Sequence, residues 1–306
     1  MEHTPVLLQE VIEGLNIIAD GIYVDCTLGR GGHSLEILKR LSNGRLIAID
    51  QDPKAIEEAK LRLVEYSDKI TYVQANFADL DSILAELNLD EVDGILMDLG
   101  VSSPQFDDPS RGFSYRHDSR LDMRMDPFNP ISAYEIVNTY PFEKLAYIFY
   151  AYGEDHYAKQ IARKIEQVRQ EHPIETTFQL VDLLRSVYPA KVLKQKGHPA
   201  KQVFQALRIE VNQELNALSI GLMSALKHLK PKGRIAVISF HSLEDRLVKH
   251  LFKEKTSIEM PDKLPIIQID LSDFVLINKK AISASQSEID SNPRAHSANL
   301  RIIQRR

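Results

Sequence analysis

The sequence of 306 residues is poor in cysteine, glycine and proline, and it has no long apolar run. Its single cysteine, Cys26, excludes an internal disulfide bond and any zinc cluster built from cysteines. The 13 glycines and 14 prolines are far too few for a collagen-like or low-complexity chain. No apolar stretch approaches the roughly 18–20 residues of a membrane helix, and Gln9 interrupts the apolar start, unlike a signal peptide. We therefore expect a soluble, cytoplasmic, globular protein that contacts no membrane.

An excess of positive charge is also lacking. The 38 lysines and arginines against 43 aspartates and glutamates give a net charge of −5, which excludes a uniformly basic nucleic-acid coat protein. Two segments without acidic residues, 183–209 and 294–306, remain as local basic blocks. Their basic residues are Arg185, Lys191, Lys194, Lys196, Lys201, Arg208, Arg294, Arg301, Arg305 and Arg306. Each block is either a phosphate-binding surface or ordinary solvated surface.

Strand-like and helix-like segments alternate through the first hundred residues. Short apolar runs at 22–24, 46–50, 70–73 and 92–98 predict buried strands, with amphipathic helices between them. The alternation returns with a strand at 234–240, a helix at about 243–254, and strands near 274–277 and 300–303. This order predicts an α/β fold, a mostly parallel sheet with helices on both faces.

Helical signals dominate the middle of the chain. Ser132–Glu135 and Thr176–Gln179 have the pattern of capping boxes, and apolar residues spaced by three or four predict one long helix over 204–229. We therefore predict three parts. They are a first part of an α/β domain (1–107), an inserted helical domain for substrate recognition (108–207) and a second part of the α/β domain (208–306).

A glycine-rich loop, Gly29–Ser34, follows the first strand, and Asp50 ends the second strand 21 residues after Gly29. Glycine lets the backbone approach a ligand closely, and an acid at the end of the second strand can accept both hydroxyls of a ribose. The pair therefore favours a nucleoside cofactor. The alternative interpretation is a tight turn between strand and helix with a capping acid.

The loop also indicates which nucleoside to expect. Its glycines are bunched as Gly-x-Gly-Gly, and Ser34 occupies the third glycine position of the dinucleotide motif. No phosphate-binding Walker loop is present either. A loop without a pyrophosphate signature favours S-adenosylmethionine, which has no phosphates. A nicotinamide-dependent oxidoreductase remains the alternative.

Asp98 ends the fourth strand, and Ser103 and Pro104 follow it. Ligands of open α/β sheets bind at the carboxyl ends of the strands, so Asp98 is expected to meet Asp50 and the glycine loop there. Ser103-Pro104 weakly resembles the motif with which amino-group methyltransferases accept hydrogen bonds from a planar amine. We take Asp98, Ser103 and Pro104 as catalytic candidates. An ordinary turn at 103–104 is the alternative.

Aromatic and metal-binding candidates have structural alternatives as well. Phe77 follows the third strand, where an adenine often packs, but it is as readily a core residue. Four aromatic residues could stack on an unpaired base or belong to the core: Phe106, Phe113, Tyr115 and Phe128. His241 and Asp245 could bind a metal, but no third ligand is evident, so we predict none.

Seven motifs in order resemble the bacterial ribosomal RNA small subunit methyltransferase H family over nearly the whole chain. The stretches are His3–Leu8, Gly29–Ser34, Asp98–Gln105, Arg111–Ser114, Leu121–Met125, Phe204–Arg208 and Ser239–Arg246. The resemblance implies a class I, Rossmann-like methyltransferase fold with an inserted helical domain. It implies S-adenosylmethionine-dependent methylation of the N4 amine of a cytidine in the decoding region of 16S rRNA, within the small ribosomal subunit or its precursor.

The resemblance also implies the cofactor contacts. These would be Gly31, Gly32, His33, Asp50, Phe77, Asp98 and Gln105. The glycine loop and His33 would surround the methionine part, and Asp50 would lie on the ribose. A non-catalytic rRNA-binding assembly factor of the same fold is a further alternative. The sequence does not indicate the oligomeric state.

Overall fold

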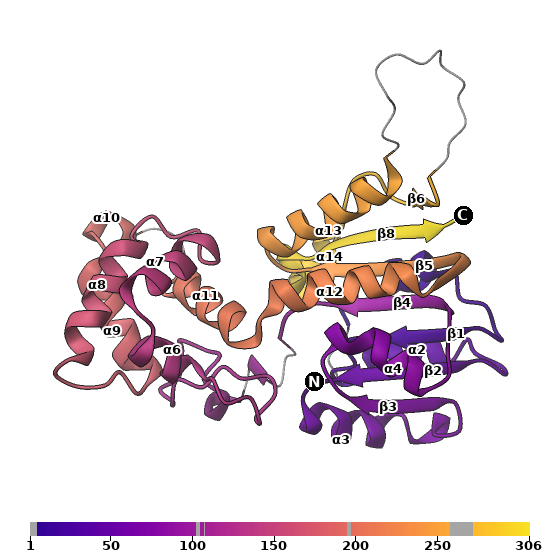
Figure 1. The fold of residues 1–306 in the computed structure, drawn as a ribbon, viewed down its shortest axis with the longest axis horizontal. Coiled ribbons are helices and arrows are strands. Elements are labelled where there is room, and N and C mark those ends of the chain that lie inside the picture. The colour runs from indigo at the N-terminus through magenta and orange to yellow at the C-terminus, as the bar shows by residue number, and fades with distance from the viewer. Residues whose placement is uncertain (1–4, 102–104, 107, 195–196, 258–271) are drawn as a thin grey trace, which may run out of the picture. The chain divides into compact units, whose positions relative to one another are not determined.

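The computed structural model describes residues 5–101, 105–106, 108–194, 197–257 and 272–306 (Figure 1). The chain divides into two compact units. The first unit comprises Met1–Gly100 and Leu215–Arg306, and the second comprises Val101–Glu214. In the described ranges, no helix has the length and apolar character needed to span a membrane.

The strands that the structure describes in the first unit form one sheet (Figure 1). The strands are β1 (Ile22–Asp25), β2 (Arg45–Asp50), β3 (Ile70–Gln74), β4 (Val92–Asp98), β5 (Leu229–Ser239), β6 (Phe274–Leu276), β7 (Ile282–Ser283) and β8 (Asn299–Arg305). Their order is β3-β2-β1-β4-β5-β8-β6, and β7 pairs with β8. Strands β1 to β5 are parallel, whereas β8 is antiparallel to its neighbours. The predicted α/β class is therefore confirmed.

Helices cover both faces of this sheet because its strands are apolar on both sides. In β2, Leu46 and Ala48 belong to one buried cluster, and Ile47 and Ile49 belong to the other. Helices α1 (Leu8–Leu15), α2 (Gly32–Leu38) and α3 (Pro53–Arg62) contribute to the first cluster. Helices α4 (Leu80–Glu86), α12 (Glu214–Lys227) and α13 (Ser242–Thr256) contribute to the second. The continuous apolar runs of the sequence thus correspond to strands buried on two faces.

The strand order fixes where a ligand can bind. The chain runs outward from β1 to β2 and β3, and then returns to place β4 on the other side of β1. Such a reversal opens a crevice at the carboxyl ends of the two central strands. Asp25 is the last residue of β1, Asp50 of β2 and Asp98 of β4. Three carboxyl groups therefore end at this edge of the sheet.

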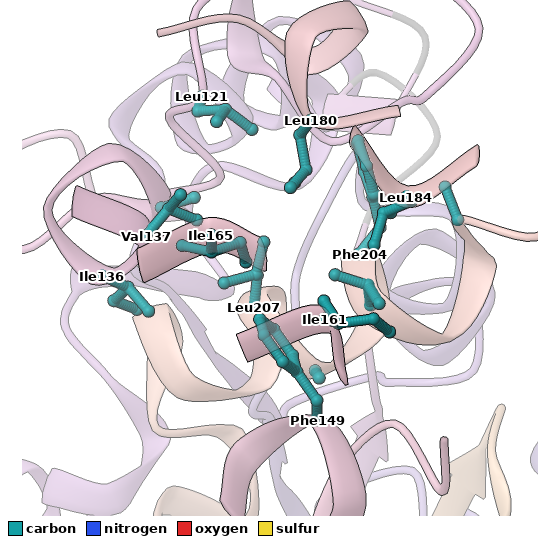
Figure 2. Packing of buried hydrophobic residues seen from close by; sticks show 14 of the residues in the cluster. Leu121, Ile136, Val137, Phe149, Ile161, Ile165, Leu180, Leu184, Phe204 and Leu207 are labelled. Atoms are coloured by element: carbon teal, nitrogen blue, oxygen red, sulfur yellow. The ribbon is translucent and has the colours of Figure 1, made fainter. Parts of the chain in front are cut away.

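The second unit is helical, as the capping patterns predict. Its helices are α6 (Ala133–Thr139), α7 (Phe142–Ala151), α8 (Ala158–Arg169), α9 (Thr177–Val187), α10 (Ala190–Leu193) and α11 (Lys201–Asn212). Both capping boxes form, at Ser132 for α6 and at Thr176 for α9. Figure 2 shows Ile161 and Ile165 of α8 among the buried side chains of neighbouring helices, in a core separate from those of the first unit.

The prediction of one long helix over 204–229 is wrong. Helix α11 ends at Asn212, and α12 begins at Glu214 after a left-handed Gln213 with φ 49°. The side chain of Asn212 accepts a hydrogen bond from the Met125 amide and donates one to the Met123 carbonyl, both at 2.8 Å. These hydrogen bonds to a distant loop satisfy the buried side chain of Asn212 at the end of the helix. The spacing of apolar residues along the chain does not indicate such contacts, so it did not predict the break.

Gly221 of α12 lies against Phe77, which follows β3. A Cβ atom on Gly221 would lie 2.6 Å from Phe77 Cδ2 and 2.9 Å from its carbonyl oxygen. We expect Gly221→Ala to destabilise the chain by about 1–3 kcal/mol, even though alanine favours helix more than glycine. Asn216→Ala at an exposed position of the same helix is the control and should be neutral or slightly stabilising. Thermal unfolding of both variants measures the difference, and a Gly221→Ala variant as stable as the control would contradict the contact.

Candidate functional site

Asp25 is a site residue that the sequence interpretation missed. Its carboxyl group is buried at the end of β1. Ser34 Oγ donates a hydrogen bond to Asp25 Oδ2 at 2.7 Å, and the Thr27 amide donates to Oδ1 at 3.1 Å. Burial raises the pKa of Asp25, while these hydrogen bonds partly oppose the rise. The available signal was an acid at the end of the first strand, four residues before Gly29.

Asp50 ties the end of β2 to the glycine loop. Its Oδ2 accepts a hydrogen bond from the Gly29 amide at 2.8 Å, and its Oδ1 accepts one from the Asp52 amide at 2.9 Å. Burial raises the pKa of Asp50 to about 6, although both amide hydrogen bonds lower it. Each carboxylate oxygen can accept a second hydrogen bond, so the group keeps the capacity to bind two hydroxyls.

The glycines of the loop are needed for its own packing. Gly31 has φ +71°, a left-handed conformation that favours glycine. A Cβ atom on Gly31 would lie 2.8 Å from Leu63 Cδ1, and one on Gly32 would lie 2.4 Å from Pro5 Cγ. The loop therefore leads into α2 with no room for side chains at these two positions.

His33, the second residue of α2, faces Asp98 across the carboxyl edge. Its Nε2 lies 3.0 Å from the Val6 carbonyl oxygen, which can only accept, so Nε2 carries a hydrogen. Its Nδ1 lies 3.5 Å from Asp98 Oδ2. The tautomer that the Val6 carbonyl selects therefore leaves Nδ1 of the neutral ring as an acceptor facing Asp98. The Asp98 backbone is held by its amide, which donates to Thr27 Oγ1 at 2.7 Å.

The other oxygen of Asp98, Oδ1, is buried and receives no hydrogen bond from the described residues. Burial, together with the carboxylates of Asp25 and Glu244, raises the pKa of Asp98 to about 8. The carboxyl group of Asp98 is therefore largely protonated at neutral pH. A buried acceptor without a donor and a strongly shifted carboxyl group are typical of a ligand-binding site.

The remaining predicted contacts fall in different places. Phe77 begins the short helix η2 (Phe77–Asp79) and is half-buried against α12. Gln105 is buried and belongs to the second unit, so its part in the cofactor site stays a prediction. Ser103 and Pro104 lie outside the described residues.

The aromatic candidates of the second unit divide between core and surface. Phe113 is buried in the helical core, and Phe106 is half-buried against it. Phe128 is 78% exposed, so it is the candidate with the most surface available for contact. Tyr115 is half-buried beside His198.

His241 and Asp245, the suggested metal pair, both contact other protein groups. His241 caps α13 in a capping box with Glu244. Asp245 accepts two hydrogen bonds from Arg301, at 2.7 and 3.0 Å. The prediction that no metal binds here stays a prediction.

The basic blocks are partly neutralised within the chain. Besides the Arg301–Asp245 pair, Arg305 pairs with Glu91 at 2.7 Å, and Arg208 pairs with Glu214 through two contacts. Phosphate binding by these three arginines stays a prediction, although each already has an acidic partner in the chain. Lys196 lies outside the described residues. The exposed basic residues of the first block are Arg185, Lys191, Lys194 and Lys201.

The raised pKa of Asp98 predicts a pH-dependent stability. Because the folded-state pKa of about 8 exceeds the unfolded value of about 4, the wild type loses stability as the pH rises between these values. Asp98→Asn lacks this ionisation. Between pH 5 and pH 9, we expect the free energy of unfolding of Asp98→Asn to rise relative to that of wild type by on the order of 1–3 kcal/mol. The whole pKa shift would give a larger change, but the Asp98 side chain is 27% exposed, so solvent screens part of the effect. Thermal unfolding at both pH values measures this, with the exposed Asp68→Asn as control. Equal pH dependence of all three proteins would contradict the shift.

Comparison with known proteins identifies the family. The model of the MraW methylase family matches residues 1–306, the whole chain. Among solved structures, the chain is similar to a putative rRNA-methylase from Clostridium thermocellum, with 13% identity, a TM-score of 0.48 and coverage of 100% of both chains. It is also similar to a putative methyltransferase from Streptococcus mutans in complex with SAH, with 10% identity, a TM-score of 0.46 and coverage of 100% of both chains.

The family match decides between the two cofactors that the glycine loop left open. The cofactor is S-adenosylmethionine, and the enzyme is an rRNA methyltransferase. The nicotinamide alternative is wrong, and the resemblance found in the motifs is confirmed. The chain belongs to the MraW methylase family, which is the ribosomal RNA small subunit methyltransferase H family.

Proposed function

We propose that this enzyme methylates the exocyclic N4 amine of a cytidine in the decoding region of 16S rRNA, in the small ribosomal subunit or its precursor. The family implies this base and this atom. The observation that carries the proposal is the Asp98 carboxyl group, which ends a central strand with one buried oxygen lacking a donor among the described residues. A primary amine next to a cationic methyl donor matches such an acceptor in both hydrogen bonding and charge.

The residues at the carboxyl edge fit the cofactor. Asp50 would accept the two ribose hydroxyls with the second lone pairs of its oxygens. Gly31, Gly32 and His33 would surround the methionine part, and Phe77 would pack on the adenine. The family resemblance implies Gln105 as a further contact. Asp98 would also contact the cofactor, as the family resemblance implies.

Binding of this cofactor would change the protonation of Asp98. Its pKa of about 8 reflects burial and two neighbouring carboxylates without a compensating cation. A positive charge in the crevice favours the ionised form. Asp98 would then be a carboxylate that holds an amine by charge-assisted hydrogen bonds.

When bound, S-adenosylmethionine supplies an electrophilic methyl group on a positively charged sulfur. The N4 amine of cytosine is a poor nucleophile because its lone pair is delocalised into the ring. Acceptors on its two hydrogens favour a tetrahedral nitrogen, whose lone pair forms the new N–C bond while the S–C bond breaks. Asp98 and Ser103-Pro104 are the acceptors we propose, and a proton leaves the nitrogen after transfer. Positioning of the amine supplies much of the remaining rate enhancement.

The target base must leave its stack to reach the crevice. We propose that the inserted helical segment, predicted at 108–207, recognises the RNA around that base. The second unit, Val101–Glu214, has its own core and can support such a surface. The exposed lysines of the first basic block would hold phosphates.

We expect N4-methylcytidine in 16S rRNA to depend on Asp98. In cells that lack the gene, wild-type protein should restore the modified nucleoside, and Asp98→Ala should leave it below about 1% of that level because the amine loses its acceptor. Mass spectrometry of nucleosides from the isolated decoding region measures both the base and the methylated atom.

Asp68→Ala, at an exposed position of the same unit, is the matched control and should restore full modification. Wild-type modification by Asp98→Ala would refute the role of Asp98. A methyl group on another atom or base would refute the proposed substrate. Absence of any rRNA methylation by the wild type would favour the assembly-factor alternative.

A further inference from the structure

Tyr115 and His198 form a stacked pair of rings in the second unit. Their centroids are 4.3 Å apart and their planes differ by 10°. Phe204 of α11 is buried in the core and meets the Tyr115 ring edge-on at 5.6 Å. Both stacked rings are half-buried. The core therefore supports the stack while part of its surface stays accessible.

Hydrogen bonds hold both sides of this stack in place. The Ala200 amide donates to His198 Nδ1 at 3.2 Å, so Nε2 carries the hydrogen of the neutral ring. On the other side, the loop that carries Tyr115 is fastened to the start of α9. Thr177 Oγ1 donates to the His117 carbonyl at 2.7 Å and accepts from the Ser119 amide at 3.1 Å. The ring pair is thus organised before any ligand binds.

The surroundings of the stack are positively charged. Burial lowers the pKa of His198, and the guanidinium groups of Arg185 and Arg116 lower it further. Both arginines are exposed. Arg185 has an exposed partner, Asp182, at 3.4 Å, a distance and exposure that give a weak pair. The neutral form of the His198 ring is therefore favoured, partly by the charges of these two arginines.

We propose that Tyr115, His198, Arg116 and Arg185 form a binding site for a single-stranded segment of the substrate RNA. A base would stack on the exposed part of the ring pair, and the two arginines would bind the flanking phosphates. This inference rests on the proposed function, because it takes RNA as the substrate. Rings combined with arginines are the usual means of binding unpaired nucleotides.

The arginines can be tested through salt dependence. The full-length double variant Arg116→Gln/Arg185→Gln should bind a fluorescein-labelled transcript of the 16S decoding region about tenfold or more weakly than wild type. The slope of log K against log[KCl] should become shallower by about 0.7 for each phosphate that the variant no longer binds. Arg163→Gln removes an exposed arginine of α8 in the same unit and should leave affinity and slope nearly unchanged.

The rings can be tested separately from the charges. His198→Leu should weaken binding about tenfold, because the base loses a stacking surface, and should leave the salt slope unchanged. Thermal unfolding of each variant establishes that it is folded. Unchanged affinity and slope in the folded double variant would overturn the site, even if the enzyme methylates cytidine N4. Conversely, a different methylated atom would overturn the proposed function and leave these binding results standing.

Discussion

Three carboxyl groups lie at one buried edge of the sheet, and the free-energy cost of burying them is the main constraint on the first unit. Asp25, Asp50 and Asp98 end neighbouring parallel strands, and burial raises the pKa of each. Hydrogen bonds to Asp25 and Asp50 offset part of that cost. Their donors are Ser34, Thr27, Gly29 and Asp52. Asp98 is the exception, because its Oδ1 has no donor among the described residues. An unsatisfied acceptor thus lies where the strand order opens a crevice.

This arrangement explains why a cation suits the site. A carboxyl group with a pKa of about 8 is largely neutral at pH 7, because burial destabilises its ionised form. A positively charged ligand would stabilise the ionised form and offset that cost. S-adenosylmethionine has a sulfonium and an ammonium group, whereas its demethylated product has lost the sulfonium charge. We therefore expect the acids to favour the substrate form of the cofactor over the product form. Release of the product would be assisted by the same electrostatics.

The sequence predicts the parts of the fold that depend on local pattern. Apolar runs such as Leu46–Ile49 identify strands because burial on both faces requires them, and the rule for strand ends places Asp50 and Asp98 together. The break at Gln213 is not predictable in this way, because it depends on hydrogen bonds between Asn212 and a loop almost ninety residues away. For the same reason the partner of Arg301 could not be predicted. Opposite charges 56 residues apart in sequence meet only once the sheet has formed.

The central claim is that Asp98 gives up a proton when the positively charged cofactor binds. Calorimetry at pH 7 in two buffers of different ionisation enthalpy measures proton release directly. The wild type should release up to about one proton for each S-adenosylmethionine bound, since a group with a pKa of about 8 is about nine-tenths protonated at that pH. Asp98→Asn should release correspondingly less. Binding by the wild type without proton release, or with the same release in Asp98→Asn, would contradict the account.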